Sequence, residues 1–555
     1  MGQRVVVGVG LLVVALVLTG SAGIASGDAN NVTSRPTIEG AYPNPIASGD
    51  AGEYVVVSLP VNSTLDNATL TDGTTRIALS NISKRGAVVI SPDPTAARKR
   101  TDRTVANLTG FELANSGETL RIEIDGERTD QLRYRDAPEG KIAVVEAGRV
   151  RWRTLGATDF QVATAGPGSV RAFVLPDNPD LPAEGLRGAT QRILLGGYTL
   201  SSERIASTLI RAHQRGVEVQ VLLEGDPVGG RTRAEARQLD RLTEAGIDVA
   251  VVAGPRARVD YHHAKYAVVD DRALVMTENW KPAGTGGNAS RGWGVVTEQG
   301  PIVDNLTATF AADRGWRDSR DWEAFRAGKT YERGESAMGT YPTNFEAATV
   351  AVNRTELLRT PDNGGDRLVG ELDDAEHSID VVQASLGAWD GRFPTALRRA
   401  AQRGVDVRIL LSSAWYSKEE NRAAVHRFRE WASRTNAGLS IKLARPDGRF
   451  EKIHAKGAIV DDETVLVGSL NWNDAAATSN REVMLLLHGR EVAAYYGDVF
   501  EADWTAGQHP ALPVGVIAAV VGCLLLAGAV LGKIRFSESA SGVGPAAGGD
   551  RSPGK

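Results

Sequence analysis

Histidine, lysine and aspartate recur together twice in this chain at the same spacing. One residue separates the histidine from the lysine, and four residues separate the lysine from the aspartate. An imidazole can attack phosphorus or transfer a proton, and an ammonium group can hold the oxygens of a phosphate. The pattern therefore favours chemistry on a phosphodiester. The predicted catalytic residues are His263, Lys265 and Asp270 in the first set, and His454, Lys456 and Asp461 in the second.

Polar side chains follow the second set at the end of a short apolar run. Ser469 and Asn471 come directly after residues 465–468. Because side chains two apart on a strand share a face, we expect His454 and Lys456 to project together from one strand. The next strand returns over the first and would bring Asn471 beside them. The predicted phosphate-binding set is Asn279 in the first copy with Ser469 and Asn471 in the second.

A single set of these residues contains only one usable histidine. Displacement at phosphorus by a covalent route needs a nucleophile on one side and an acid for the leaving group on the other. Two copies packed about a pseudo-twofold axis would supply both groups. Both copies lie in one chain of 555 residues, so we expect a monomeric active site that needs no second subunit.

The surrounding sequence is duplicated as well. Residues 209–223 parallel residues 397–411 at a separation of 188, and the two histidines are 191 residues apart. Apolar strand patterns alternate with amphipathic helix patterns in both regions. Near-constant spacing over this distance predicts an α/β fold with two repeated domains, at residues 166–325 and 345–507.

On these residues, the region from about 166 to 505 resembles the phospholipase D superfamily. The resemblance implies two β-sheets flanked by helices. It also implies that His263 attacks phosphorus to form a phosphohistidine. His454 would then protonate the leaving alcohol and activate water or an acceptor alcohol. The residues alone leave open which histidine attacks.

The resemblance assigns roles to the remaining residues too. Lys265 and Lys456 would hold the non-bridging oxygens with the asparagines, and Asp270 and Asp461 would be structural. Glu482 fits the acid that orients a catalytic histidine in this family. No metal and no other cofactor is implied, because the lysines carry the positive charge.

The first copy departs from the family pattern in three places. Met276 and Thr277 stand where the second copy has Gly-Ser, and residues 291–294 offer no clear counterpart to Glu482. The Gly-rich loop at residues 281–291 is either a substrate-side rim or an uninvolved surface loop. His262 is out of phase with its neighbour, so we expect it in the core or on the surface rather than in the site.

The region before the repeats reads as β structure. Short alternating runs are separated by turn clusters, which predicts a small sandwich over residues 34–144. Residues 42–45, 52–55 and 70–73 resemble a lamin-tail, immunoglobulin-like domain. The resemblance implies a binding or spacing module.

Apolar segments at both ends predict an exported membrane protein. Residues 1–25 have the order of a signal peptide, with an uncleaved anchor as the alternative. Residues 512–533 are long enough to span a bilayer, and the basic start of the tail at 534–555 would keep that tail in the cytoplasm. The catalytic part would then be extracellular. Sequons such as those at Asn31, Asn62 and Asn67 suggest a glycoprotein from an archaeon or a eukaryote.

Three functions fit these observations. A membrane-anchored phosphodiesterase that cleaves or transfers phosphodiesters, phospholipids above all, comes first because lipid headgroups would lie nearby. An exported metal-independent nuclease is second, although the net charge of −5 implies no general attraction to nucleic acid. A non-catalytic surface binding protein with a degenerate site is third, and two intact motif sets argue against it. The lone cysteine, Cys523, excludes intrachain disulfides.

Overall fold

The computed structural model describes residues 35–61, 65–101, 103–106, 111–146, 148–334 and 337–507. The predicted signal peptide at 1–25, membrane span at 512–533 and tail at 534–555 lie outside the described residues. Within the described ranges, no helix combines the length and the apolar character needed to cross a membrane. The described residues divide into two compact units, with the division between Ala157 and Thr158.

The first unit is built mainly from β-strands. One sheet has the order β10-β9-β1-β2-β5-β6 and the other has the order β4-β3-β7-β8. Both sheets contribute apolar side chains to one core, which includes Val55 and Val57 of β2 and Leu120 and Ile122 of β7. The elements are β1 Thr37–Tyr42, β2 Tyr54–Leu59, β3 Ala68–Thr71, β4 Arg76–Ala78, β5 Gly86–Ile90, α1 Pro94–Ala97, β6 Thr104–Val105, β7 Gly117–Ile124, β8 Glu127–Arg135, β9 Lys141–Glu146 and β10 Arg149–Thr154.

The two-sheet architecture agrees with the predicted β-rich region, but the predicted boundary at residue 144 is wrong. Strand β10 pairs with β9 along its whole length, from Arg149↔Glu146 to Thr154↔Lys141. The unit therefore continues ten residues beyond the predicted end. The lamin-tail-like character of this unit stays a prediction.

The second unit contains two mixed sheets, one centred on each repeat. The first has the order β19-β15-β14-β13-β16-β17-β18-β12-β20, with β25 paired to β18, and the second has the order β11-β21-β28-β27-β26-β22-β23-β24. The strands of the first are β12 Gly168–Leu175, β13 Arg192–Gly197, β14 Glu218–Glu224, β15 Asp248–Val252, β16 Tyr266–Val269, β17 Arg272–Met276, β18 Ser290–Thr297, β19 Ser319–Asp321, β20 Ala348–Val352 and β25 Lys452–Ile453. Those of the second are β11 Ala163–Ala165, β21 Arg354–Thr360, β22 Ser378–Gln383, β23 Asp406–Leu411, β24 Leu439–Leu443, β26 Gly457–Val460, β27 Thr464–Gly468 and β28 Glu482–His488.

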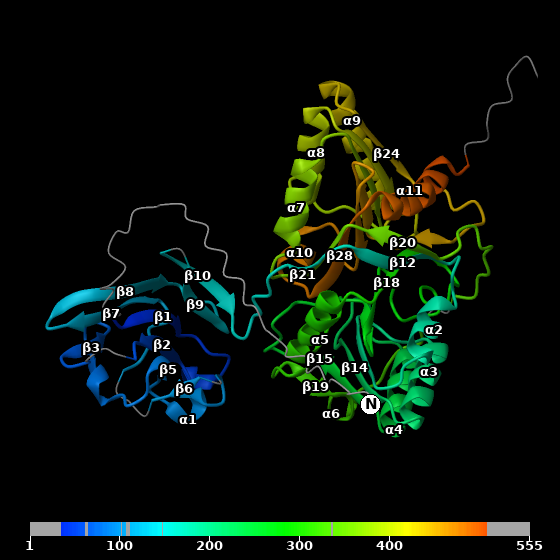
Figure 1. Cartoon of the computed structure of the whole chain (residues 1–555). Coiled ribbons are helices and arrows are strands. Elements are labelled where there is room, and N and C mark those ends of the chain that lie inside the picture. The colour runs from blue at the N-terminus through cyan, green and yellow to red at the C-terminus, as the bar shows by residue number, and fades with distance from the viewer. Residues whose placement is uncertain are drawn as a thin grey trace, which may run out of the picture. The chain divides into compact units, whose positions relative to one another are not determined.

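Helices lie on the outer faces and between the sheets of this unit (Figure 1). Residues of α5 and α11 share one apolar core with strands of both sheets. Helices α2, α3 and α4 pack on the first sheet, and α7, α8 and α9 pack on the second. The helices are α2 Leu181–Arg187, α3 Glu203–Gln214, α4 Arg233–Glu244, α5 Gly300–Arg314, α6 Trp322–Arg326, α7 Gly364–Asp374, α8 Arg392–Arg403, α9 Lys418–Thr435, α10 Asp474–Thr478 and α11 Arg490–Thr505.

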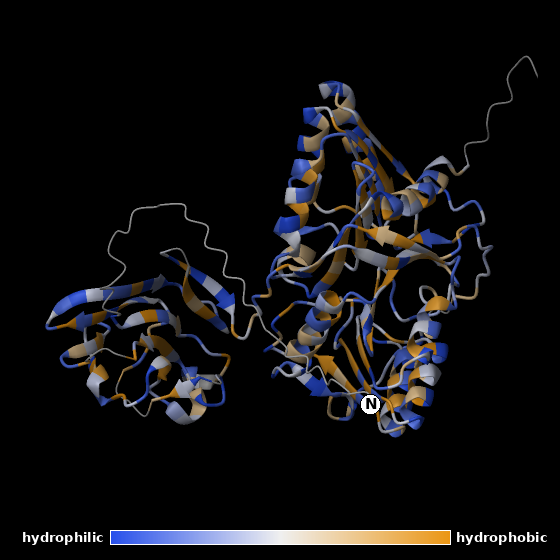
Figure 2. Cartoon of the chain, viewed as in Figure 1, coloured by the Kyte–Doolittle hydropathy of each residue, from blue (hydrophilic) through white to orange (hydrophobic). Residues whose placement is uncertain are grey.

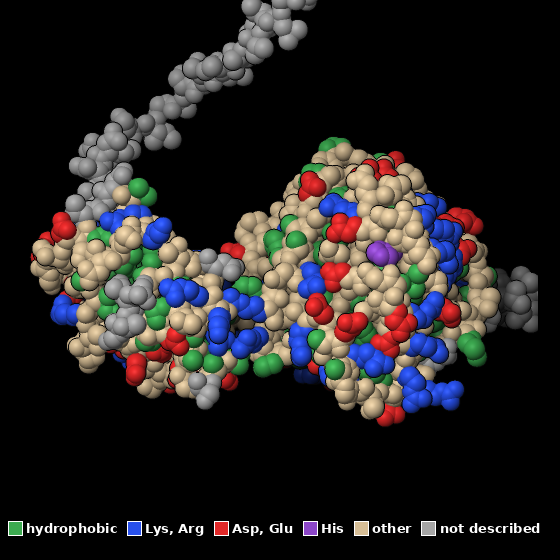
Figure 3. All heavy atoms as spheres, turned by 90° about the horizontal axis from the view of Figure 1, so that it is seen from below, with side chains coloured by type: hydrophobic (Ala, Val, Ile, Leu, Met, Phe, Trp, Pro, Cys, Tyr) green, Lys and Arg blue, Asp and Glu red, His purple; other side chains and the backbone are tan. Residues whose placement is uncertain are grey.

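Hydropathy explains this layering. The central strands are mostly hydrophobic, whereas the outer helices carry a hydrophobic and a hydrophilic side (Figure 2). Side chains of β16, for example, are buried throughout, as expected of strands covered on both faces. Acidic and basic side chains lie intermingled on the face of the molecule drawn in Figure 3, which fits the mild net charge of −5.

The repeats exchange their first strands, so the predicted boundaries at 166–325 and 345–507 do not separate the two sheets. Strand β20 lies in the sequence of the second repeat but pairs with β12 of the first sheet. Reciprocally, β11 precedes the first repeat but pairs with β21 of the second sheet. This exchange joins the repeats into one unit.

Candidate active site

The motif histidines and lysines lie just before a strand rather than on it, which corrects the sequence prediction. His263 and Lys265 precede β16, and His454 and Lys456 lie between β25 and β26. Each lysine Nζ donates a hydrogen bond to the carbonyl oxygen of its own histidine, at 2.6 Å in the first set and 2.8 Å in the second. Both lysines are fully buried. A Lys ammonium has three donors, so two remain for a phosphate.

His263 is held by a carboxylate of the other repeat. Its Nδ1 lies 2.9 Å from both carboxylate oxygens of Glu482. Burial alone would raise the pKa of Glu482, but interactions with His263 and Lys265 outweigh burial and lower it. An ionised Glu482 accepts the Nδ1–H proton and leaves Nε2 as the free nitrogen of His263. Glu482 thus lies beside His263, where the family resemblance expects an acid that orients a catalytic histidine.

His454 faces a carboxylate that the sequence interpretation missed. Its Nδ1 lies 3.3 Å from Oε1 of Glu278, a residue that is almost completely buried. Neither of these two atoms makes an aligned hydrogen bond among the described residues. The signal in the sequence was a carboxylate two residues after the end of β17, where the second repeat has Leu470.

Cross-repeat backbone contacts bring the two sets together. The N–H of His263 donates to the carbonyl of Arg481, and the N–H of His454 donates to the carbonyl of Arg291, at 2.9 Å and 3.0 Å. Each histidine segment therefore lies against the start of a strand of the opposite repeat: His263 against the residue before β28, and His454 against the second residue of β18. Lys456 contributes to lowering the pKa of His263, and Lys265 to lowering that of His454, as expected for one shared site.

Burial and positive charge shift the pKa values inside the site. Burial, with Lys265 and Lys456, lowers the pKa of His263 to about 4. Burial and the same two lysines hold the pKa of His454 well below its usual range. Burial also lowers the pKa of Lys456 to about 8 and that of Lys265 well below its ordinary value. The site therefore favours an anionic ligand that restores charge balance.

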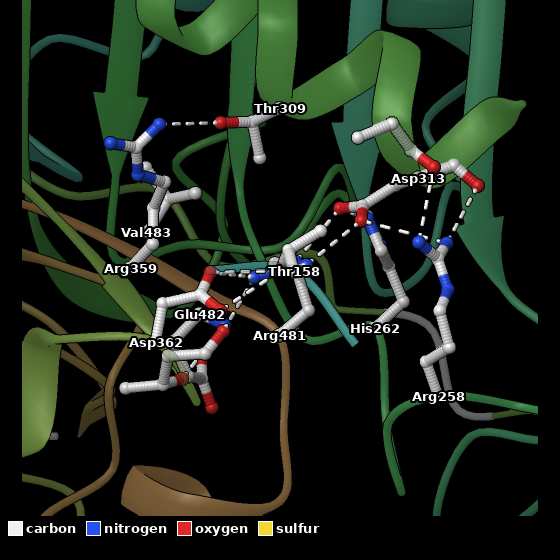
Figure 4. Close-up of polar contacts among 12 residues, drawn as sticks. Thr158, Arg258, His262, Thr309, Asp313, Arg359, Asp362, Arg481, Glu482 and Val483 are labelled. Atoms are coloured by element: carbon white, nitrogen blue, oxygen red, sulfur yellow. Dashed lines mark hydrogen bonds and ion pairs between the residues drawn. The ribbon is translucent and has the colours of Figure 1, made fainter. Parts of the chain in front are cut away.

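A buried ion-pair network fixes the strand that carries Glu482. Arg481 contacts Asp313 of α5 through Nε and Nη2 at 2.9 and 3.0 Å, and Asp362 through Nη1 at 3.0 Å (Figure 4). Burial alone would raise the pKa of Asp313, but Arg481, His262 and Arg258 hold it well below its usual range. His262 lies in this network, 3.5 Å from Asp313. This placement confirms the prediction that His262 points away from the site.

Arg291 of the first repeat forms an equivalent network with a helix of the second repeat. It makes ion pairs with Asp177 and with Asp503 of α11, at 3.0 Å from its Nε for the latter. Arg481 therefore ties the second repeat's strand to a helix of the first, and Arg291 ties the first repeat's strand to a helix of the second. Two reciprocal buried pairs fix the register in which the histidines meet.

The two motif aspartates lie outside the site. Asp270 accepts hydrogen bonds from the backbone N–H groups of Thr190, Gln191 and Arg192 at 2.8–2.9 Å. Asp461 accepts three backbone N–H groups of the equivalent loop before β22 in the same way, at 2.7–2.9 Å. Both carboxylates anchor a loop. Their inclusion in the predicted catalytic set is therefore corrected to the structural role that the family resemblance implied.

The predicted phosphate-binding residues divide into two kinds. The hydroxyl of Ser469 donates to the Val483 carbonyl at 3.3 Å and accepts from the Val483 N–H at 3.0 Å, and its side chain is fully buried. Ser469 thus joins β27 to β28, and we withdraw its predicted contact with substrate. Asn279 is half-buried with a side-chain oxygen that lacks a partner among the described residues, and Asn471 is half-buried at the equivalent place. These two carboxamides stay available for a phosphate.

The Gly-rich loop at residues 281–291 lies beside the second motif. The carbonyl of Ala289 accepts a hydrogen bond from the N–H of Glu451 at 2.7 Å, three residues before His454. Its predicted role at the substrate rim stays a prediction. In the part of the chain that the structure describes, no group of three or more His, Cys, Asp or Glu side chains is arranged to hold a metal ion.

Comparisons with known proteins found a matching family model and several similar proteins. The family model described as cardiolipin synthase, PLD-like domain, matches residues 183–314 and 368–504. Cardiolipin synthase B of Salmonella typhi is 26% identical over 339 residues, which cover 55% of this chain and 73% of that protein. Phospholipase D of Rickettsia felis is 31% identical over 156 residues, covering 26% of this chain and 70% of that protein. The solved phosphatidylserine synthase of Haemophilus influenzae Rd KW20 is 14% identical with a TM-score of 0.45, covering 62% of this chain and 86% of its own.

One match of the family model falls in each repeat, and each match contains one of the two motif sets. The identity to the Rickettsia felis phospholipase D extends over more than two thirds of that protein. This chain belongs to the phospholipase D superfamily.

Proposed function

We propose that this protein is a phosphodiesterase of the phospholipase D type that cleaves or transfers phospholipids through a phosphohistidine. The observation that carries the proposal is the pairing of two imidazoles in one site, each next to a carboxylate from the opposite repeat. Lys265 and Lys456 supply the positive charge for a diester anion. Such preorganised charge in a buried site stabilises a phosphoryl-transfer transition state.

In the first step, Nε2 of His263 attacks phosphorus as the bond to the leaving alcohol breaks. The leaving oxygen takes a proton from His454, and a P–N bond to His263 remains. A pKa of about 4 keeps His263 unprotonated and nucleophilic at neutral pH. The bound anion opposes the lysine charges that lower the pKa of His454, so substrate binding favours the protonated acid.

In the second step, water or an acceptor alcohol attacks the same phosphorus. Its proton passes to His454, and the P–N electron pair returns to His263. Hydrolysis therefore converts diester and water to monoester and alcohol, whereas an alcohol acceptor yields a new diester. His454 regains the proton that it lost in the first step, so the cycle closes without any other group.

Two observations favour a phospholipid substrate. The similar curated proteins are named cardiolipin synthase B and phospholipase D. In addition, large apolar side chains of the described second unit are exposed in segments next to the site. These are Val228, Met338, Trp415 and Tyr416.

Contacts connect each of these segments to the site. The N–H of Val228 bonds the hydroxyl of Tyr198, whose ring packs 4.7 Å from that of His263. The ring of Tyr416 lies 5.5 Å from Nζ of Lys452, two residues before His454. Gly339, next to Met338, exchanges hydrogen bonds with Asn288 of the Gly-rich loop. Aromatic and aliphatic tips around a polar site suit a lipid–water interface.

The predicted export signals complete the proposal. A signal peptide at 1–25 and a membrane span at 512–533 would put residues 26–511 outside the cell, with the site near lipid headgroups. The β-rich first unit, which ends with β10 at Thr154, would act as a lamin-tail-like spacing or binding module. Placement in the cell membrane rests on the sequence alone.

Incubation of the full chain with phosphatidylglycerol vesicles or with single- and double-stranded DNA, in chelator, tests this proposal. Wild type should release phosphatidate or form a diphosphatidyl product, and His263→Ala should do neither. A Trp415→Ser/Tyr416→Ser variant should lose activity on vesicles and keep it on a short-chain soluble diester. DNA cleavage with intact lipid would instead favour a nuclease. Inertness toward every diester would favour a binding protein.

A further inference from the structure

The two repeats carry an equivalent pair of hydrogen bonds between their last strands. Thr277 N–H donates to the Trp293 carbonyl at 2.9 Å, and Trp293 N–H donates to the Thr277 hydroxyl at 3.0 Å. Ser469 and Val483 make the same two contacts, at 3.0 Å each. Thr277 therefore corresponds to Ser469, and Trp293 corresponds to Val483.

This correspondence shows that the carboxylate stands at a different position in each repeat. Glu482 precedes Val483, and its counterpart before Trp293 is Gly292. Glu278 follows Thr277, and its counterpart after Ser469 is Leu470, which belongs to the apolar core. The second repeat thus combines an apolar residue with an acid, and the first combines an acid with glycine.

The space around Gly292 fits the exchange. A Cβ atom added at Gly292 would lie 2.3 Å from Cγ and 2.6 Å from Oε1 of Glu278. The Glu278 side chain therefore fills the volume in which a side chain at position 292 would begin. A Cβ at Gly284 would likewise lie 2.6 Å from Oε2 of Glu278. Two glycines make room for a carboxylate that enters from the neighbouring strand.

We infer that Glu278 is the positioning residue for His454, replacing the acid missing at position 292. Its Oε1 lies 3.3 Å from Nδ1 of His454, and only 3% of its side chain is exposed. This inference rests on the proposed function, because it assigns a residue to one step of the proposed cycle. Glu278 acts through His454 by holding the ring so that Nε2 can give and take the substrate's proton.

Bis(p-nitrophenyl) phosphate separates the two steps. Its first leaving group departs readily, so His263 can form the phosphohistidine with little help from an acid, whereas hydrolysis of the P–N bond still needs His454 as a base. Glu278→Gln should therefore show a burst of nitrophenol equal to the enzyme concentration, followed by turnover slower by about a hundredfold or more. Glu482→Gln is the matched control and should lose the burst, because it disturbs the nucleophile.

A rescue variant distinguishes positioning from general disruption. Glu278→Leu/Gly292→Glu rebuilds the residue pair of the second repeat. It should turn over about tenfold or more faster than Glu278→Leu alone, because the acid again faces His454. Melting temperatures of all variants are compared with wild type.

Unchanged turnover in Glu278→Gln would overturn the inference. Loss of the burst together with turnover in a variant that melts like wild type would overturn it too, because Glu278 would then serve the first step. A burst in Glu482→Gln but none in Glu278→Gln would exchange the two histidine roles. An inactive wild type would instead reject the proposed function.

Discussion

The two half-sites share a backbone frame but hold their histidines differently. His263 has Nδ1 at 2.9 Å from both oxygens of a carboxylate with no exposed surface, whereas Nδ1 of His454 lies 3.3 Å from one oxygen of Glu278. The side chain of His454 is 20% exposed, against 11% for His263. Backbone hydrogen bonds therefore preserve the symmetry of the repeats, while the side chains that complete each half can differ.

The pKa values of the two carboxyl groups also differ between the halves. Burial raises the pKa of Glu278 to about 7 even though Lys456, Lys265 and Lys452 oppose it, whereas the pKa of Glu482 is lowered by His263 and Lys265. A fixed anion next to His263 suits a nucleophile that must keep one tautomer. A carboxyl that titrates near neutrality next to His454 suits a group that must lose and regain a proton.

Removal of each imidazole should have the largest effect and should separate the halves most clearly. His263→Ala should lower turnover by about 10⁴-fold or more and abolish the nitrophenol burst, because no nucleophile remains. His454→Ala should keep the burst and lose steady-state turnover. Stopped-flow absorbance measures both phases, and a burst only in His263→Ala would reverse the assignment.

Loss of the negative charge at Glu482 should have the second largest effect on turnover. Glu482→Gln can donate to Nδ1 of His263 and so favours the wrong tautomer, which should cost about 10²- to 10⁴-fold in turnover. Glu278→Gln should fall at the lower end of that range, at about a hundredfold, because its contact with His454 is longer. Steady-state rates on one soluble diester give the ratio, and a larger loss at Glu278 would contradict the comparison.

The pH dependence should report the buried lysines. With the pKa of Lys456 lowered to about 8 from an ordinary 10.5, its ammonium loses charge as the pH rises through about 8. The ratio kcat/KM should therefore fall on the alkaline side at about pH 8 or below. The alkaline fall in kcat should occur at a higher pH than the fall in kcat/KM, because bound diester stabilises the ammonium group. A flat kcat/KM profile up to pH 10 would contradict this explanation.

The two anchoring aspartates should have the smallest effects and should behave alike. Asp270→Asn and Asp461→Asn each keep one acceptor, so each should lower the free energy of unfolding by about 1 kcal/mol and leave kcat within about twofold. The pKa of both carboxyls is lowered by backbone N–H groups. Their contribution is therefore fully present above the ordinary carboxyl pKa, and the difference from wild type should fade as the pH falls from there through the lowered folded-state pKa. Urea unfolding at two pH values measures the loss in free energy of unfolding. Unequal losses in the two variants would contradict the equivalence of the two aspartates.

Local sequence was sufficient for much of the site. The His-x-Lys spacing located the imidazoles and lysines, and the family resemblance pointed to Glu482. Prediction failed for Ser469, because its hydroxyl is taken by the backbone of a strand that the spacing does not identify. It also failed for Glu278, because the missing acid was sought at its own strand position, around Gly292, rather than on the neighbouring strand.

The sequence by itself determined the duplication, the α/β class and the chemistry of the motif residues, since these depend on residue types, on periodicity and on short separations. Only the tertiary structure decided the exchange of β11 and β20, the crosswise pairing of His263 with Glu482, and the approach of Glu278 to His454. These features join residues separated by up to 219 positions. Such contacts are selected by burial and packing between the repeats, and no local pattern encodes them.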